Sequence, residues 1–267
     1  RMLAFNGATQ VSSVELQSTL CEQGQKAALQ QGLAMQFSQV DVLKDDTTSL
    51  FNTQMHAVAL HACGALHQAM MRKAIAANVQ QISFSPCCYH LFTPNDYLPM
   101  SELAKQSQLR LTHRDLKLAL QETVTAPTRV DKIRKTELEW RLGFDALRRS
   151  ITNELHYVSV PSVNKAVFSG SFKSFCEWAG DKKALKIPQG IDYEYFLSVG
   201  VARKKVTDRV ELVRHVFRRA IEVWLVLDRA LYLQQHGYQV SIKTFCEKQL
   251  TPRNILILAN TNPSTNN

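Results

Sequence analysis

Two short apolar runs within residues 56–90 each end in small, polar and nucleophilic side chains, and this pattern constrains the fold most. The first run, 57–60, stops at residues 61–64, His-Ala-Cys-Gly. The second, 82–84, stops at residues 85–90, Ser-Pro-Cys-Cys-Tyr-His. A helix-like spacer separates them, which is typical of a βαβ unit with parallel strands. Ligands of open α/β sheets bind beyond the carboxyl ends of the strands, so these two ends predict a site.

The remaining hydrophobic pattern extends this unit into an α/β fold. We expect strands at 11–16, 35–42, 57–62, 81–85, 238–245 and 254–259. We expect helices at 1–6, 18–31, 65–79 and 206–235. The linker 44–55 leaves room for a helical turn or two. The last two strands predict an antiparallel hairpin that closes a sheet whose earlier strands are parallel.

Four segments follow from this pattern. Residues 1–100 form the N-terminal part of the sheet domain, and residues 101–205 form a large, mostly helical insertion in which 160–200 is mixed. Residues 206–260 supply the long helix and the hairpin that complete the sheet. The polar residues 261–267 are expected to be a disordered tail and a natural end of the chain. The abrupt start at Arg1, in a helix-like run, indicates an N-terminal truncation.

Charge and cysteine content limit the class of protein. Among the 267 residues the net charge is +9, which favours a polyanionic partner such as RNA over simple solubility. Six cysteines without a CxxC pair favour a reducing compartment, and we expect a cytoplasmic protein. No apolar run approaches the roughly 18 residues of a membrane helix, and no secretory signal precedes the first strand, so no membrane partner is expected.

Two acids end successive strands. A carboxylate at Glu15 is suited to accept hydrogen bonds from both hydroxyls of a ribose, and one at Asp41 is suited to accept a hydrogen bond from an adenine amine. The alternative is an ordinary solvated acid at each strand end, and Asp45 and Asp46 compete with Asp41.

The two polar clusters allow several roles. His61 and His90 are candidates for an acid, a base or a hydrogen-bond donor, and Tyr89 for a stacking surface. Gly64 lets a backbone approach a ligand closely. A shaped substrate pocket is the favoured interpretation, and its lining residues are expected to be Ser85, Pro86, Cys87, Cys88 and Tyr89.

Two other interpretations of the cysteines are less favoured. Cys63 and the Cys87-Cys88 pair have the chemistry to bind zinc with His61, but adjacent strand residues point in different directions, so we expect no metal. A redox or covalent cysteine is the second alternative.

Basic residues concentrate in two later stretches, 132–149 and 203–219. Arg214 and Arg218 share a helical face, which predicts contact with phosphates of a substrate. Interspersed acids such as Asp208 and Glu222 make a solvated helix surface the alternative.

The signatures HACGAL and SPCCYH resemble those of a family of class I S-adenosylmethionine-dependent methyltransferases. They are similar to the HxCG and CCxH signatures of tRNA 2′-O-ribose methyltransferases acting on acceptor-stem nucleotide 4. They are also similar to the signatures of a related group of methyltransferase-like proteins. The later segments LDRALYLQQHGYQV and TPRN of this chain resemble the C-terminal strands of that group. The resemblance covers roughly residues 1–100 and 220–260.

The resemblance implies a Rossmann-like, seven-stranded sheet with a reversed last strand. It implies that Glu15 holds the ribose of S-adenosylmethionine, Asp41 the adenine amine, and that residues 61–64 (His61, Ala62, Cys63, Gly64) and 85–90 line the site. The family's first strand, central in the sheet, and its glycine-rich loop would lie just before Arg1.

We therefore expect methyl transfer to RNA, either tRNA or rRNA, with His61 or His90 as base and Tyr89 orienting the acceptor. A protein methyltransferase, and a non-catalytic RNA-binding module on a degenerate methyltransferase fold, are the alternatives.

Overall fold

The computed structural model describes residues 2–7, 10–91, 96–119, 128–247, 250–251 and 253–261, without the side chains of residues 61 and 128–131. The chain divides into two compact units. Unit 1 contains Arg1–Gln121 and Arg218–Asn267, and unit 2 contains Glu122–Phe217. These boundaries lie further along the chain than the predicted ones at 100/101 and 205/206. The predicted tail lies outside the described residues, apart from residue 261.

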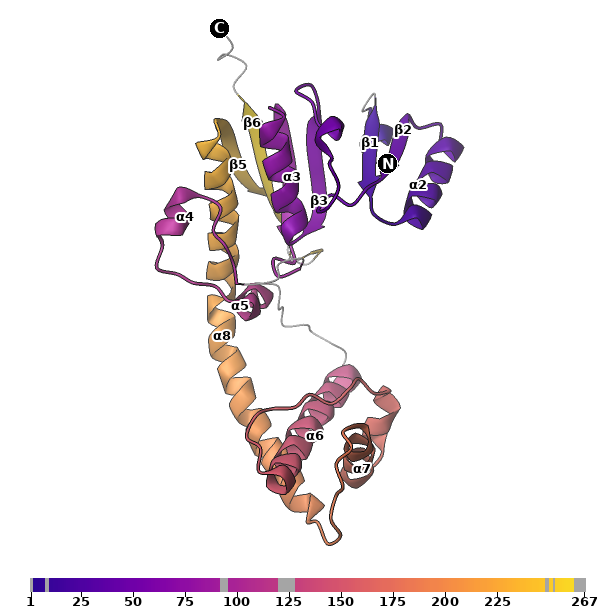
Figure 1. Ribbon diagram of the computed structural model, residues 1–267, viewed down its shortest axis with the longest axis vertical. Helices are drawn as coiled ribbons and strands as arrows, with labels where there is room; N and C mark the ends of the chain where they lie inside the picture. The colour runs from indigo at the N-terminus through magenta and orange to yellow at the C-terminus, as the bar shows by residue number, and fades with distance from the viewer. Residues whose placement is uncertain are drawn as a thin grey trace. The chain divides into compact units, whose positions relative to one another are not determined.

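The first part of unit 1 is a small parallel βαβ unit. The short helix α1 (Met2–Phe5) precedes β1 (Val11–Glu15), α2 (Ser18–Gln30) and β2 (Met35–Gln39). β1 and β2 pair in parallel with Glu15 opposite Gln39 and form a two-stranded sheet (Figure 1). β2 ends earlier than the predicted 35–42, so Asp41 lies in the turn that follows the strand.

A second, four-stranded sheet has the order β3-β4-β6-β5. The 3-10 turn η1 (Thr48–Leu50) leads to β3 (His56–Cys63), α3 (Ala65–Ala76) and β4 (Gln81–Cys87), and β3 and β4 are parallel. β5 (Tyr238–Thr244) and β6 (Ile255–Thr261) pair antiparallel, and β6 also runs antiparallel to β4. The fold is thus mixed α/β, with β6 reversed relative to its sheet neighbours.

Helices α3 and α8 (Tyr193–Gln235) pack on the same face of this sheet (Figure 1). Met71 of α3 and Val226 and Leu233 of α8 join Ile82, Phe84 and Ile257 of the strands in one apolar core. Burying such side chains contributes roughly 1.5–3 kcal/mol each, so this layer is the main source of stability in unit 1.

A buried carboxylate on α8 ties the segment after the β4 loop to this core. Asp228, 1% exposed, accepts hydrogen bonds from Tyr97 Oη (2.5 Å), Met100 N (2.9 Å), Ser101 N (2.8 Å) and Ser101 Oγ (2.7 Å). Ser101 also caps the short helix α4 (Glu102–Gln106). Helix α5 (His113–Leu118) begins with a capping box between Thr112 and Asp115.

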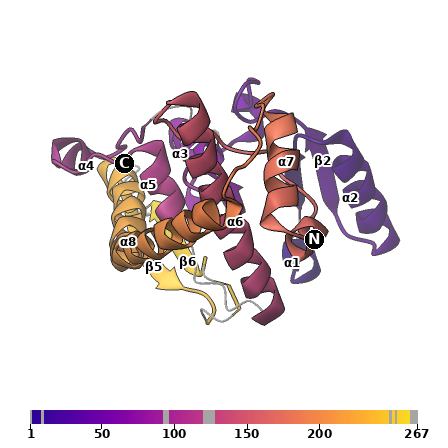
Figure 2. The ribbon, with the colours of Figure 1, turned by 90° about the horizontal axis from the view of Figure 1, so that it is seen from below.

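Unit 2 is built on α6 (Thr128–Thr152), η2 (Lys165–Ser169), α7 (Phe172–Lys182) and the first part of α8 (Figure 2). Its core is aromatic: Trp140 and Phe144 of α6 pack on Phe175 of α7 with ring centroids 5.7 and 6.4 Å apart. The second core explains why this segment forms a unit of its own.

Helix α8 starts at Tyr193, well before the predicted 206, because Gly200 does not interrupt it. A Cβ at Gly200 would lie 2.2 Å from the carbonyl oxygen of Glu139 and 2.9 Å from the Cα of Gly143, both on α6. The glycine therefore allows α8 and α6 to cross closely within unit 2. Asp192 accepts from the Tyr195 N–H at 2.9 Å and caps the earlier start.

Among the described residues, no helix combines the length and the apolar character needed to cross a membrane.

We expect Asp228→Ala to lower the free energy of unfolding by roughly 3–5 kcal/mol, because it leaves buried donors without an acceptor. Denaturant unfolding measures the change. Glu102→Ala, which removes a carboxylate 66% exposed and paired with Lys105, is the control and is expected to cost under about 1 kcal/mol. Equal losses in the two variants would refute the role of Asp228.

Candidate functional site

The two polar clusters meet at one end of the four-stranded sheet, as the sequence predicted. Parallel pairing places Cys63 of β3 opposite Cys87 of β4, with an irregularity between Leu60 and Cys63. The Sγ atoms of Cys63 and Cys87 lie 3.5 Å apart. Both strands run further than predicted, so these cysteines belong to the strands and not to the loops after them.

Residue 85 ends the predicted strand, and residues 86 and 87, predicted to follow it, also belong to β4. Ser85 and Cys87 are 1% and 0% exposed, and Pro86 is also buried. Ser85 Oγ donates to the carbonyl of Arg253 at 3.1 Å, which holds the β5–β6 connection against β4. Pro86 fits this strand because it faces the irregular part of β3 and no longer pairs with β6. Substrate contact by these three residues stays a prediction.

Gly64 is needed by the neighbouring loop, and its expected place beside a ligand stays a prediction. Its φ is +53°, and a Cβ would lie 1.7 Å from the carbonyl oxygen of Leu91. The Gly64 N–H donates to Cys87 O at 3.0 Å, and the Ala65 N–H donates to Leu91 O at 3.1 Å. The loop after β4 is therefore joined directly to the turn between β3 and α3.

The backbone at Cys88 departs from the extended conformation of β4, and this brings the side chains of Cys87 and Cys88 to the same place. Its φ is +44°, a left-handed conformation that non-glycine residues rarely adopt. The Sγ atoms of Cys63, Cys87 and Cys88 all lie within 4.8 Å of one another. We call these three residues the thiol cluster. The sequence-based expectation that Cys87 and Cys88 point apart was wrong, because it assumed an extended backbone through Cys88.

Burial favours the protonated thiol at two members of the thiol cluster, Cys63 and Cys87. It raises the pKa of Cys63 and raises the pKa of Cys87 strongly, and the neighbouring thiols add to the rise at Cys87. The Arg253 guanidinium opposes this at both residues. A thiolate is the reactive form of cysteine, so Cys63 and Cys87 are poorly suited to nucleophilic catalysis at neutral pH.

His67 on α3 supports the end of β3, and the sequence analysis did not single it out. Its Nδ1 lies 2.8 Å from the carbonyl oxygen of Ala62, and its Nε2 accepts from Arg229 Nε at 2.6 Å. Burial, with help from Arg229, holds the pKa of His67 well below its usual range. A neutral ring that donates from Nδ1 and accepts at Nε2 satisfies both contacts. A lone histidine within a helical pattern gives no signal of this role.

Tyr89 is buried against Arg229 and is not a free stacking surface. Its side chain is 2% exposed, and the Arg229 guanidinium lies 4.9 Å from its ring centroid. The His67 ring meets it edge-on at 6.2 Å. An acceptor base could stack on this ring only if the guanidinium moved away, so the expected stacking role does not fit the observed packing.

His90 is half-buried beside His113, with ring centroids 5.8 Å apart. Burial, Lys117 and His113 all lower the pKa of His90. Its Nδ1 is buried without a hydrogen-bond partner among the described residues. The lowered pKa favours the neutral ring that a base requires. The backbone of His61 lies in β3, and its side chain is outside the described residues.

Glu15 and Asp41 follow neighbouring parallel strands at the same end of the first sheet. Glu15 Oε1 accepts from the Gln17 N–H at 3.0 Å, and Asp41 Oδ1 accepts from the Leu43 N–H at 3.0 Å. Asp41 also forms an exposed pair with Lys44 at 3.7 Å. Lys73 of α3 donates to Val42 O at 2.8 Å, which connects this end of the first sheet to α3.

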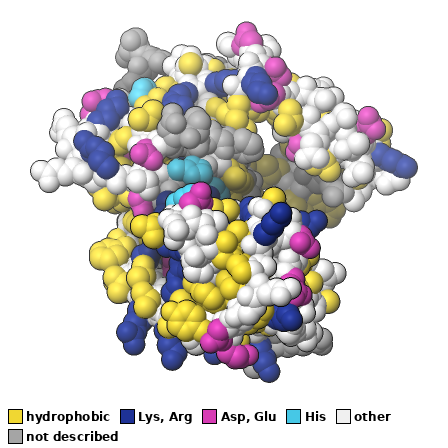
Figure 3. Space-filling model, turned by 60° about the horizontal axis from the view of Figure 1, so that its bottom comes forward, with side chains coloured by type: hydrophobic (Ala, Val, Ile, Leu, Met, Phe, Trp, Pro, Cys, Tyr) yellow, Lys and Arg dark blue, Asp and Glu magenta, His cyan; other side chains and the backbone are white. Residues whose placement is uncertain are grey.

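Many residues of the basic stretches are engaged within the protein. In unit 2, Asp145, 1% exposed, forms ion pairs with Arg148, Arg149 and Arg203. Arg214 pairs with Glu211 at 2.6 Å, and Arg218 is half-buried. On the face in Figure 3, Lys and Arg side chains are interspersed with acidic and apolar ones. The expected phosphate contacts of Arg214 and Arg218 stay predictions.

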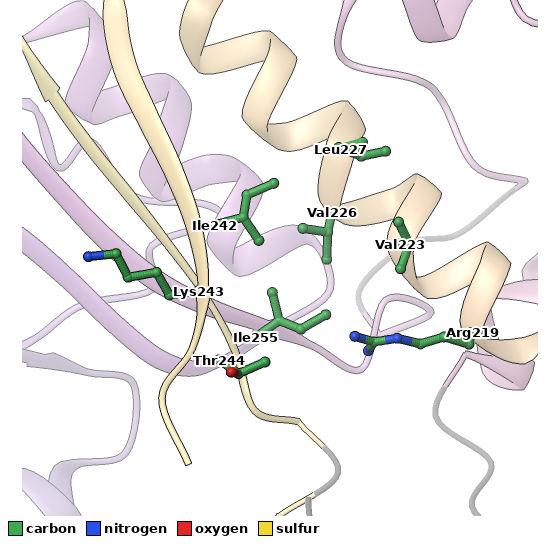
Figure 4. Close-up of a pocket in the computed structure, with 8 residues that line it drawn as sticks. All are labelled: Arg219, Val223, Val226, Leu227, Ile242, Lys243, Thr244 and Ile255. Atoms are coloured by element: carbon green, nitrogen blue, oxygen red, sulfur yellow. The ribbon is translucent and has the colours of Figure 1, made fainter. Parts of the chain in front are cut away.

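An apolar groove of about 590 Å³ lies between α8 and the β5–β6 pair (Figure 4). Val223, Val226 and Leu227 of α8 face Ile242 and Ile255 of the strands, as the close-up shows. The sequence analysis did not predict this groove, because each lining residue reads as part of a helix or strand core.

We expect Gly64→Ala to lower the free energy of unfolding by at least about 2 kcal/mol more than Gly32→Ala. Both residues have positive φ, but an added Cβ at Gly32 meets no atom within 4 Å. Gly32→Ala therefore reports the backbone cost alone, roughly 1–2 kcal/mol. Denaturant unfolding compares the variants, and similar losses would contradict the close contact with Leu91.

We expect stability to fall as the pH drops from 7 to 5.5, and His67 to cause part of the fall. Its folded pKa lies below the unfolded value of about 6.5, so the unfolded state binds more protons in this range, by up to about 1.4 kcal/mol per pH unit. His56 and His90 also have lowered pKa values and contribute to the same fall in stability. The pH profile of the wild type is therefore compared with that of His67→Gln, which loses only the contribution of His67. Parallel pH profiles of unfolding free energy for the two proteins would contradict this.

Residues 2–95 match the family model of a methyltransferase domain. No solved structure matches the chain. The matched segment contains β1 to β4 with both polar clusters, so the site described above lies within it, apart from the contacts made by α8 and Arg253. The match supports a methyltransferase, and therefore a transferase.

Proposed function

We propose that this protein is an S-adenosylmethionine-dependent methyltransferase that acts on RNA. The observation that carries the proposal is the methyltransferase-domain match over residues 2–95, which contain two parallel strand pairs that end in the candidate site residues. The cofactor supplies an electrophilic methyl group on a sulfonium. The protein's own residues bind it, align the acceptor and exclude water.

Glu15 and Asp41 are the proposed cofactor ligands. Both carboxylates lie at the carboxyl ends of parallel strands and are half-buried, a position in which they can accept from ribose hydroxyls and an adenine amine. The residues present thus fit the nucleoside end of the cofactor. His61, Ala62 and Cys63, at the end of β3, are proposed to face its other end.

We propose that the two sheets are parts of one continuous sheet in the active protein. Among the described residues, β1 pairs only with β2, and β3 pairs only with β4. One further parallel strand between β1 and β3 would give the seven-stranded sheet with a reversed strand that the resemblance implies. Glu15 and Cys63 would then lie at the same edge of one Rossmann-like sheet, two strands apart.

His90 is the better-supported candidate for the base that takes a proton from the acceptor. Its half-buried ring lies within the loop after β4 that is bonded to the turn at Gly64 and Ala65, and its buried Nδ1 has no partner among the described residues. His61, at the end of β3, is the second candidate. Tyr89 acts from the core, through its packing on Arg229, and not by stacking on the acceptor.

The basic side chains that remain exposed favour RNA as the acceptor. Within the stretches 132–149 and 203–219, five of them lie in unit 2, on α6 and α8: Lys132, Arg134, Lys135, Lys205 and Arg209. The described residues offer none of them an ion-pair partner. Such cations bind phosphates and make affinity fall steeply with salt.

We expect the full-length protein to bind S-adenosylmethionine and to transfer labelled methyl groups to unmodified tRNA or rRNA. Glu15→Ala should weaken cofactor binding in calorimetry by at least about tenfold, because hydrogen bonds to a charged group contribute about 1.5–3 kcal/mol each. Glu22→Ala, an exposed acid on α2, is the control and should leave affinity unchanged. Absence of cofactor binding would refute an enzyme and favour an RNA-binding module.

The acceptor is identified in the same assay. Label in protein but not in RNA would refute RNA and favour a protein methyltransferase. His90→Ala should lower kcat by about 100-fold or more if His90 is the base. A kcat within a few-fold of wild type for both His61→Ala and His90→Ala would exclude base catalysis by either residue.

A further inference from the structure

We propose that the thiol cluster is a binding site for a single Zn²⁺ ion, held by Cys63, Cys87 and Cys88. The inference is independent of the methyltransferase proposal, because it rests on the positions of three sulfur atoms. Cysteine sulfur is a preferred zinc ligand, and three such ligands satisfy most of the tetrahedral coordination that zinc adopts.

The distances between the sulfur atoms fit one ion. Zn–S bonds of about 2.3 Å at tetrahedral angles place two sulfurs about 3.8 Å apart. The Cys63 and Cys87 sulfurs are 3.5 Å apart, and all three lie within 4.8 Å of one another. A separation of 3.5 Å is far longer than the S–S bond of about 2.05 Å in a disulfide.

The backbone is held in the conformation that gathers the thiols. Cys88 has φ +44°, and such strained residues persist only where the surroundings enforce them, often at functional sites. The Leu91 N–H donates to Cys88 O at 2.8 Å, and the Gly64 N–H donates to Cys87 O at 3.0 Å. These bonds fix the two strand ends relative to each other, so the ligands are preorganised.

The surroundings suit a thiolate complex. Binding breaks three S–H bonds, forms three Zn–S bonds and releases three protons to solvent, without a change of oxidation state. The complex of Zn²⁺ with three thiolates carries one negative charge, and the positive charge of Arg253 acts on both Cys63 and Cys87. Cys63 and Cys88 are half-buried, which leaves the ion a route of entry.

Three protein ligands leave the fourth position for water or a substrate atom. Zinc sites that take part in reactions keep such a position, whereas purely structural sites have four protein ligands. Thiolates that bind separate irons of an iron–sulfur cluster lie further apart than thiolates sharing one ion, so the compact cluster favours a mononuclear site.

Metal content and cobalt spectra test the site on the full-length protein. Purified without chelator from zinc-supplemented medium, it is expected to hold about one zinc per chain by mass spectrometry. Co²⁺ added to stripped protein should give a thiolate-to-cobalt charge-transfer band and the d–d bands of a tetrahedral site. Cys88→Ser should weaken zinc binding by more than about 100-fold, beyond the loss typical of an outer-shell change.

Cys246→Ser, a half-buried cysteine outside the cluster, is the matched control and should bind zinc and cobalt like wild type. Circular dichroism shows whether each variant folds. If Cys88→Ser does not fold, the cobalt spectrum of the wild type decides alone. No charge-transfer band, zinc content equal in wild type and folded Cys88→Ser, stoichiometric iron instead of zinc, or a Cys63–Cys87 disulfide in freshly isolated protein would each overturn the proposal.

Discussion

The close contact between Gly64 and the Leu91 carbonyl fixes the candidate site. It brings the turn after β3 within hydrogen-bond distance of the loop after β4, with bonds of 3.0 and 3.1 Å. A residue with a Cβ at position 64 would push the turn after β3 away from the loop after β4. The thiol cluster and the position of His90 both depend on this junction, because all of these residues lie within a few positions of it.

Buried polar contacts support the junction from behind. Arg229, fully buried on α8, donates to His67, which holds the Ala62 carbonyl at the end of β3. Arg229 also donates to Tyr97, which in turn donates to Asp228. A charge removed from water is costly unless its partners are complete, so this chain of contacts ties the site to the position of α8. Changes far from the strand ends on α8 therefore affect the site.

Periodicity and local motifs predicted most of the framework. The alternation of strands and helices from 11 to 87, the meeting of the two polar clusters and the acids after β1 and β2 all follow from spacing and composition. The start of α8 did not, because its first turns pack closely on α6 at Gly200, and this contact between distant segments leaves no local pattern. The clustering of Cys87 and Cys88 also did not, because it depends on one left-handed residue. Arg229 and His67, 162 positions apart, leave no joint signal in a single sequence.

The central claim is that the ends of β3 and β4 form one ligand site within a methyltransferase domain. Hydrogen exchange with S-adenosylhomocysteine, the demethylated product of the cofactor, tests it most directly. The account predicts slower exchange in peptides covering residues 61–65 and 87–91 together, along with the segment after Glu15. Protection confined to the groove between α8 and β5, with both strand ends unchanged, would contradict it.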